Sequence, residues 1–156
     1  MVAWNEFAAS APMLAEQVRA RLEQRKHHTM ATLRADGSPR VSGTEVRIVG
    51  GALTFGVMRG AVRAADLRRD PRVAIHSQNV DPPDDAPEAW AGEAKVSGRA
   101  VAVPSPPVAA EAEQPAGDHF AVDLDEVVLT TIGPGGDHLV VEWWTPSGGV
   151  RRVERR

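Results

Sequence analysis

The sequence predicts a mainly β (α+β) fold, an antiparallel barrel or sandwich with six or seven strands and two helices. Three observations lead to this prediction. Short segments of alternating apolar and polar residues recur along the chain, glycine-containing turns separate several of them, and only two segments place apolar residues at helical spacing. The 156 residues suffice for one domain with its own core, so we expect a single domain over residues 1–156.

The N-terminal region predicts a helix followed by a β-hairpin. We expect one amphipathic helix over residues 11–25, preceded by a short turn. Its apolar stripe consists of Leu14, Val18 and Leu22. Residues 29–33 predict a strand, and an Asp-Gly turn connects it to a long strand over residues 40–49.

The central stretch, residues 50–76, predicts a strand, a short basic helix and a second strand. Gly50-Gly51 supplies the positive φ angles of a tight hairpin before a strand over residues 52–57. A helix begins near Ala61, and Asp70-Pro71 ends it before the next strand, residues 72–75.

The start of this basic helix is a candidate anion site. The backbone N–H groups of a first helical turn have no intrahelical partner, and the helix dipole adds partial positive charge there. Arg59 and Arg63 lie on either side of the predicted start. We therefore expect a phosphate-sized anion between them.

The second half of the chain predicts further strands and two loops. Residues 78–90 have no periodic apolar face and should form an exposed loop, whereas residues 104–117 predict a surface loop or a short helix around residues 108–113. The expected strands are residues 92–103, 120–124, 127–132 and 138–145.

Composition excludes several classes of function. The net charge of −3 gives no reason to expect nucleic acid or a membrane surface as a partner. The chain has no cysteine, and its five histidines lack the spacing of zinc ligands, so no metal site is predicted. With no apolar run long enough for a membrane span or a signal peptide, we expect a cytoplasmic protein.

Two features leave alternatives open. One face of the 40–49 strand is partly polar, which is explained either by a ligand wall or by a solvent face or subunit contact, and Gly43 permits close backbone approach there. Trp143-Trp144 are typical of core and interface packing, or Trp144 could stack on a planar ligand.

From about Leu14 to Glu154 the chain resembles the pyridoxamine 5'-phosphate oxidase-like split-barrel superfamily, which binds FMN or its deazaflavin relative. The resemblance is carried by residues 31–39, ATLRADGSP, and residues 58–73, MRGAVRAADLRRDPRV. The first stretch resembles the family's first hairpin, and the second its cofactor-phosphate strand, helix and next strand. It implies an antiparallel split β-barrel with an N-terminal helix and a short helix between central strands.

The resemblance also implies a homodimer with the isoalloxazine ring in a groove between the subunits. Trp144 matches a family tryptophan close to the ligand pocket, and Ser42, Gly43 and Thr44 would run along the ring. The family's Ser-Arg-Lys phosphate group falls on residues 61–63, where only Arg63 is a cation. The candidate cofactor-binding residues are Arg40, Ser42, Gly43, Thr44, Val57, Met58, Arg59, Arg63, His76 and Trp144.

The leading functional hypothesis is a flavin- or deazaflavin-dependent oxidoreductase that transfers hydride between FMN or F-420 and an unidentified small molecule. No protein catalytic residue is assigned. The rival hypotheses are a non-catalytic carrier or sensor of flavin, deazaflavin or haem, and an architectural dimer with a vestigial groove. Deazaflavin is expected to bind more tightly than FMN, because arginines remain for a longer anionic tail, namely Arg34, Arg40, Arg47 and Arg59.

Overall fold

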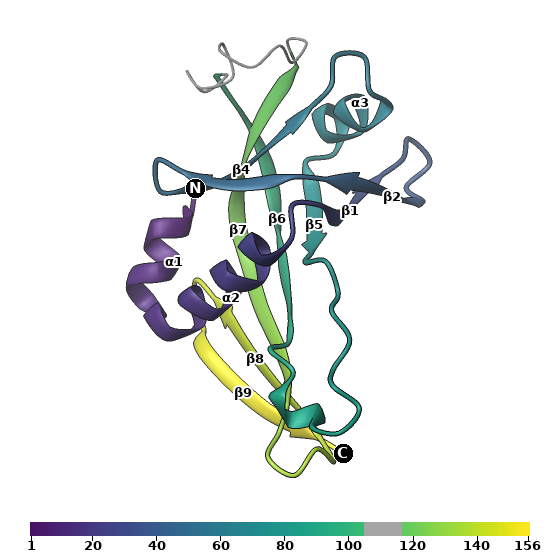
Figure 1. Ribbon diagram of the computed structural model, residues 1–156. Helices are drawn as coiled ribbons and strands as arrows, with labels where there is room; N and C mark the ends of the chain where they lie inside the picture. Colours follow the sequence, from purple (N-terminus) through teal and green to yellow (C-terminus); the bar gives the residue numbers. More distant parts are fainter. Residues whose placement is uncertain (105–116) are drawn as a thin grey trace.

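The computed structural model describes residues 1–104 and 117–156, which form one antiparallel sheet with three α-helices (Figure 1). The strands are β1 (His28–Leu33), β2 (Pro39–Thr44), β3 (Val46–Val49), β4 (Ala52–Val57), β5 (Arg72–His76), β6 (Glu93–Val103), β7 (Asp118–Ile132), β8 (Leu139–Thr145) and β9 (Gly149–Arg155). The helices are α1 (Trp4–Ser10), α2 (Pro12–Gln24) and α3 (Val62–Arg69), with a 3-10 turn, η1 (Pro87–Ala89). The mainly antiparallel split-barrel fold, its N-terminal helix and its short helix between central strands are confirmed.

The sheet runs in the order β2-β1-β5-β6-β7-β4-β3, and β8 and β9 extend it from β7. Two tight turns make its local hairpins. Gly37, with φ 83°, donates its N–H to the Arg34 carbonyl at 2.9 Å between β1 and β2. Gly50-Gly51, also at positive φ, joins β3 to β4. These are the turn residues that the sequence predicts.

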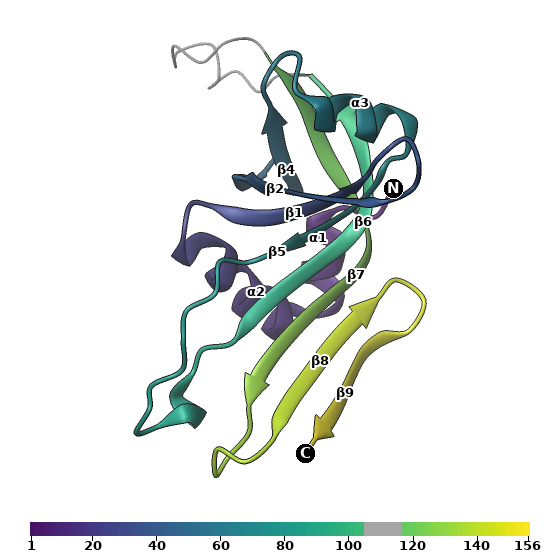
Figure 2. The ribbon, with the colours of Figure 1, turned by 90° about the vertical axis from the view of Figure 1, so that its right-hand side faces the viewer.

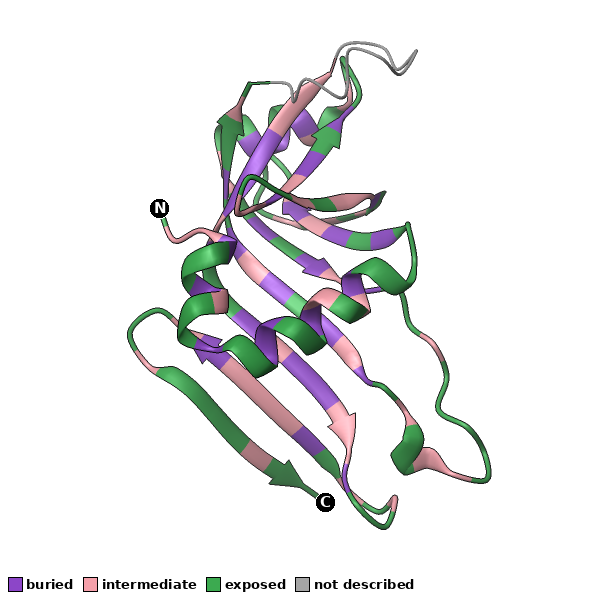
Figure 3. Cartoon of the chain, turned by 60° about the vertical axis from the view of Figure 1, so that its left-hand side comes forward, coloured by how far each residue is buried: buried purple, intermediate pink, exposed green. Residues whose placement is uncertain are grey.

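Helices α1 and α2 cover one face of the sheet, and the core lies beneath them (Figure 3). Trp4 and Phe7 of α1 are buried with the predicted stripe of α2. In the described ranges, the opposite face of β5 to β9 carries no helix (Figure 2). The sheet therefore has a covered face that holds the core and a second face, called the uncovered face here, on which no described helix packs.

The predicted elements differ from the structure at the N-terminus, where the expected short turn is helix α1. The Glu6 carboxylate accepts the Ala3 backbone N–H at 3.0 Å, which caps the start of this helix. Trp4 and Phe7, three residues apart, bury their rings edge to face with centroids 5.2 Å apart. Seven residues give too short a periodic pattern to stand out in the sequence.

The strands also differ in number, since the described residues form nine and the sequence predicts six or seven. The long strand over residues 40–49 divides at Glu45, because β2 pairs with β1 whereas β3 pairs with β4. The basic C-terminal residues form β9, whose side chains are nearly all exposed. The segments over residues 120–132 merge into one strand, β7.

The two loops predicted in the second half have different outcomes. Residues 78–90 form the connection between β5 and β6, with η1 as a single turn and the Trp90 indole N–H donating to the Val80 carbonyl at 2.5 Å. The alternative of a loop or helix for residues 104–117 falls on residues 105–116, which lie outside the described residues. Within the described ranges, no helix has the length and apolar character needed to cross a bilayer.

Candidate functional site

The junction between β4 and α3 leaves a helix start without a side-chain cap. Gly60, at φ 77°, turns the chain out of β4, and Ala61 precedes the helix in extended conformation. Alanine has no side-chain acceptor, so the first-turn amides of Val62 and Arg63 have no capping group. The inward face of the helix consists of Ala64, Asp66 and Leu67, which are buried.

Arg63 connects this helix start to strand β2. Its Nη1 donates to the Gly43 carbonyl oxygen, which fixes the guanidinium between the two elements. Its Nε is buried without a partner among the described residues, and burial lowers the pKa of the guanidinium. The arginine is thus held in place while part of its donor capacity is unused.

Ser42, the residue before Gly43, has a second unused polar group. It lies opposite Met30 in the β1–β2 register, and its side chain points to the same inner face of the hairpin. Its Oγ is buried, and none of the residues in the described ranges makes a hydrogen bond to it. Buried polar groups almost always have partners. Ser42 Oγ on β2 and Arg63 Nε on α3 are two such exceptions among the described residues.

Arg40 points toward α3 and is engaged by the protein itself. Its Nε lies 2.5 Å from Asp66 Oδ2, and Arg69 reaches the other oxygen of that carboxylate at 3.0 Å. The Thr32 hydroxyl donates to Asp66 Oδ2 at 3.4 Å. The hydrogen bond from Arg40 is the main reason that the pKa of Asp66 lies below its usual value. Arg40 is therefore close to the candidate site, with its Nε paired.

Met58 and Arg59 are exposed at the end of β4. Arg59 lines a surface pocket of about 290 Å³ together with Gly60, Arg68 and Asp118. In this pocket Arg68 and Asp118 form an ion pair at 2.5 Å. The cation of Arg68 is thus balanced, whereas the described residues give Arg59 no acidic partner.

Gly43 and His76 lie on the outer face of the sheet. Both pair with Thr29 of β1, which places the three residues in one row across β2, β1 and β5. A Cβ at Gly43 would meet no atom within 4 Å, so the strand has free space in front of it. The His76 Nδ1 lies 2.7 Å from the Ser77 carbonyl oxygen, and its Nε2 lies 3.4 Å from Glu93.

The other three candidate residues have buried side chains. Thr44 and Val57 face the interior. Trp144 is only 3% exposed and packs on Phe7 with ring centroids 4.9 Å apart. Of the two interpretations of Trp144, the structure supports core packing, and its ring is not open to a ligand in this chain. Because neighbouring strand residues point to opposite faces, Trp143 is on the uncovered side.

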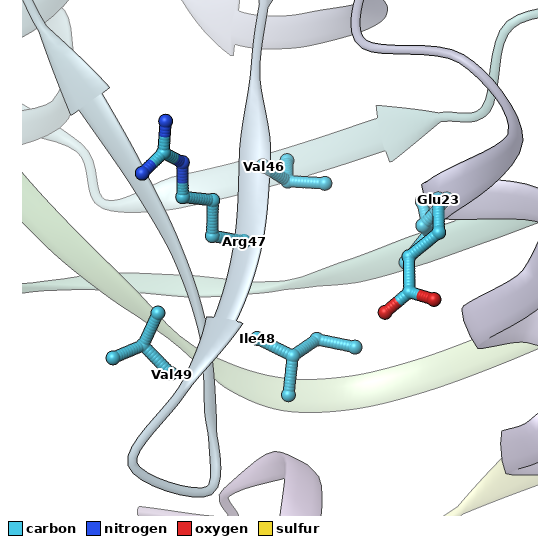
Figure 4. A pocket seen from close by; sticks show the side chains of 6 residues that line it. Glu23, Val46, Arg47, Ile48 and Val49 are labelled. Atoms are coloured by element: carbon cyan, nitrogen blue, oxygen red, sulfur yellow. The ribbon is translucent and has the colours of Figure 1, made fainter.

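A second pocket, of about 280 Å³, lies between the end of α2 and β3 (Figure 4). Val46 and Ile48 point into it from β3, opposite Glu23, while Arg47 and Val49 lie on the other side of the strand. None of the ten candidate residues lines this pocket. Arg47, considered for an anionic tail, is thus separate from the helix start.

Sequence reasoning missed Asp66, which is the most buried carboxylate near the site. The available signal was a single acidic residue inside a basic helix, but an exposed ion pair would give the same pattern. The described residues contain no cluster of three or more histidine, aspartate or glutamate side chains arranged to hold a metal ion.

The residues at the β2–α3 junction fit the phosphate end of a cofactor. They offer an uncapped helix start, an anchored arginine and a serine hydroxyl that has no partner among the described residues. On the opposite side of β2, the open space at Gly43 suits a flat group.

The described fold has clear relatives among known proteins. The family model for pyridoxamine 5'-phosphate oxidase matches residues 14–141. A pyridoxamine 5'-phosphate oxidase-related, FMN-binding protein from Nostoc punctiforme is similar in structure, with TM-score 0.63, 10% identity and coverage of 94% of this chain and 96% of the other. No curated protein sequence matches the chain.

Two further solved structures share the fold. PhzG from Burkholderia lata, in complex with tetrahydrophenazine-1-carboxylic acid, has TM-score 0.62 and 10% identity, and the match covers 98% of this chain and 93% of the PhzG chain. A heme binding protein from Mycobacterium smegmatis has TM-score 0.53 and 16% identity, and the match covers 91% of this chain and 87% of the other. Since the family model spans most of the sequence, the chain belongs to the pyridoxamine 5'-phosphate oxidase family.

Proposed function

We propose that this protein binds a flavin-type cofactor, FMN or the deazaflavin F-420, with the cofactor phosphate at the start of α3, and that it is an oxidoreductase. The observation that carries the proposal is the β2–α3 junction, where Arg63 is anchored on Gly43 and where two buried polar atoms have no partner among the described residues. A phosphate oxygen would accept hydrogen bonds from Arg63 and from the first-turn amides.

Each part of the junction has a distinct role in the proposed site. Arg63 supplies charge and direction, because its contact with Gly43 removes most of the freedom of the side chain before a ligand arrives. The uncapped amides supply hydrogen bonds that need no side chain. The outer surface of β2 at Gly43 gives a planar ring an approach to the backbone. When bound, the cofactor supplies the hydride chemistry.

The phosphate end has fewer side-chain ligands than the Ser-Arg-Lys group of the family, since Ala61 and Val62 replace the hydroxyl and one cation. We therefore infer that F-420, with a longer anionic tail, binds more tightly than FMN. Arg59 is a suitable contact for that tail, because it is exposed beside the helix start and the described residues give it no acidic partner.

The proposal is tested by the visible spectrum of the purified protein before and after addition of FMN and of F-420. Binding of either cofactor changes its band shape and is followed to saturation. Multiple turnovers with a reductant and a series of small-molecule acceptors then test the oxidoreductase activity. A protein whose addition leaves both spectra unchanged would contradict the proposed function.

A second candidate function, a non-catalytic module that holds flavin, deazaflavin or haem, is favoured by His76. Its imidazole is partly exposed on the uncovered face, and its Nδ1 lies within hydrogen-bond distance of the Ser77 carbonyl oxygen. A backbone contact of this kind is usual for a histidine whose other nitrogen binds a metal. In this chain that nitrogen, Nε2, lies 3.4 Å from Glu93, so a haem iron would have to displace this carboxylate. Haem titration of the wild type and of His76→Ala decides this alternative, because a Soret band that depends on His76 would support it. A cofactor that binds but that no acceptor reoxidises would also support this module.

The proposal includes a homodimer and a small-molecule substrate as partners. The uncovered face carries half-buried apolar side chains that a second copy could cover. Two cross-strand pairs contribute, and they are Val128 with Trp143 and Val141 with Val153. A second copy on this face would cover these side chains and would bring its own residues close to the row that contains Gly43 and His76.

A further inference from the structure

Asp66 is a buried carboxylate to which the proposed phosphate site assigns no role. Its side chain is 3% exposed and meets two arginines and one hydroxyl. The partners come from three elements, because Thr32 lies on β1, Arg40 on β2 and Arg69 on α3 itself. A carboxylate that is buried with this number of partners holds its neighbours in defined places.

The network joins the same two elements as the Arg63 contact. On α3, Asp66 follows Arg63 by three residues, which places the two side chains on the same side of the helix. On β2, Arg40 precedes Gly43 by three residues. Helix α3 is therefore tied to β2 at two points one turn apart, through Arg63 to Gly43 and through Asp66 to Arg40.

The helix has a third connection at its C-terminal end, where Arg69 Nη2 donates to the Leu33 carbonyl oxygen at 2.6 Å. Arg69 also reaches Asp66, so that the carboxylate orients both arginines. Without it, Arg40, whose side chain is 22% exposed, would be a poorly compensated cation beneath the helix.

We propose that Asp66 is a positioning residue for the phosphate site: it holds α3 against β2 so that Arg63 and the first-turn amides converge on one point. This inference rests on the proposed function. Asp66 does not touch the phosphate in this arrangement, and its effect passes through Arg40 and the helix. It also pairs with Arg40 and Arg69, whereas Arg63 makes no ion pair among the described residues and can meet the phosphate at this junction.

The test compares FMN with riboflavin, which has the same ring and no phosphate. Both are titrated against the wild type and the Asp66→Asn variant, with folding checked by circular dichroism. We expect Asp66→Asn to weaken FMN by about tenfold, because a displaced Arg63 would lose one charge-assisted contact with the phosphate, and to leave riboflavin unchanged. A merely structural role would weaken both ligands together.

The matched control is Asp70→Asn, which removes a carboxylate at the end of the same helix. Asp70 also pairs with an arginine, Arg72 at 2.6 Å, but does not contact β2. Its FMN affinity should equal that of the wild type. If Asp66→Asn does not fold, Arg40→Gln replaces it, because this variant leaves Asp66 paired with Arg69 and should show the same phosphate-specific loss.

The outcomes separate the two claims. A wild type that binds neither FMN nor F-420 contradicts the proposed function. If the wild type binds FMN, two results would contradict only the positioning role. In the first, the Asp66→Asn and Arg40→Gln variants bind FMN as tightly as the wild type. In the second, they lose affinity for riboflavin to the same extent as for FMN. In the Asp66→Asn/Arg40→Gln double variant, a loss of FMN affinity that differs from the sum of the two single losses would support an effect that passes through the Asp66–Arg40 pair.

Discussion

Arg63 is the side chain on which the proposed phosphate site depends most. We expect Arg63→Ala to weaken cofactor binding by about ten- to a hundred-fold, because a charge-assisted contact contributes roughly 1.5 to 3 kcal/mol. Fold stability should change little, since the side chain is partly exposed. Titration with FMN at low and raised salt measures this effect, and the loss should persist when diffuse attraction is screened.

The control for Arg63→Ala is Arg68→Ala on the same helix. Arg68 is 60% exposed and pairs with Asp118, away from β2. Its removal should have little effect on FMN affinity. Equal losses in the two variants would indicate diffuse electrostatics, and no loss in either would place the anion elsewhere.

Gly43 allows a separate test of the ring side of β2. Gly43→Val should fold normally, because the position has open space and because valine is favoured in strands. The new side chain would occupy the surface proposed for the ring, so FMN and riboflavin affinity should both fall. Gly56→Val on β4 is the matched control, since a Cβ there meets only His119 at an ordinary 3.5 Å. Unchanged FMN and riboflavin affinity in Gly43→Val would show that the ring does not bind on this face.

At single positions, the sequence predicts chemistry better than it predicts which way a side chain faces. Arg63 was identified from a helix start and a basic residue, both of which are local signals. The pairing of Arg40 with Asp66 was not predictable, because it joins residues 26 positions apart through the fold. The sequence around Trp144 is the same whether this residue packs in a core or on a ligand. Only its contact with Phe7 decides between the two roles.

The start of β1 predicts a pH dependence of stability, because His28 is buried there. Burial is the largest cause that lowers the pKa of its imidazole below the usual 6.5. The unfolded chain then binds a proton more readily than the folded chain does. The stability is fully present above about pH 6.5 and decreases as the pH falls below that value.

Urea unfolding at pH 7.5 and 5.5 measures this effect, with His28→Asn as the reference that does not titrate. The wild type should lose more stability than His28→Asn between the two pH values. The carboxyl groups of Asp66 and Asp70 do not interfere in this window, since their pKa values are lowered, that of Asp70 to about 2. Equal losses in both proteins would mean that His28 is hydrated or already paired.

Among the elements, those with strong local signals are predicted well and those defined by distant partners are not. The β1–β2 and β3–β4 hairpins follow from their Asp-Gly and Gly-Gly turns. The division at Glu45 depends on which strand each half pairs with, which no local pattern contains. Strand β9 has no buried face, so it lacks the alternation by which strands are recognised.

At the scale of the whole molecule, the uncovered sheet face predicts a dimer. Light scattering at micromolar concentration should give twice the chain mass, because burial of the apolar pairs on this face stabilises association. Trp143→Glu should shift the protein toward the monomer by placing a charge in the contact. Met13→Glu, on the exposed side of α2, is the control and should remain dimeric. A wild-type mass equal to one chain at all concentrations would remove the shared-groove arrangement.

The most direct test of a cofactor phosphate at the start of α3 is the affinity of the wild type for FMN relative to riboflavin. Calorimetric titration at two salt concentrations provides it. We expect FMN to bind at least about tenfold more tightly, since one charge-assisted contact has at least that effect, and we expect the advantage to persist at raised salt. Equal affinity for FMN and riboflavin would contradict phosphate binding at the start of α3.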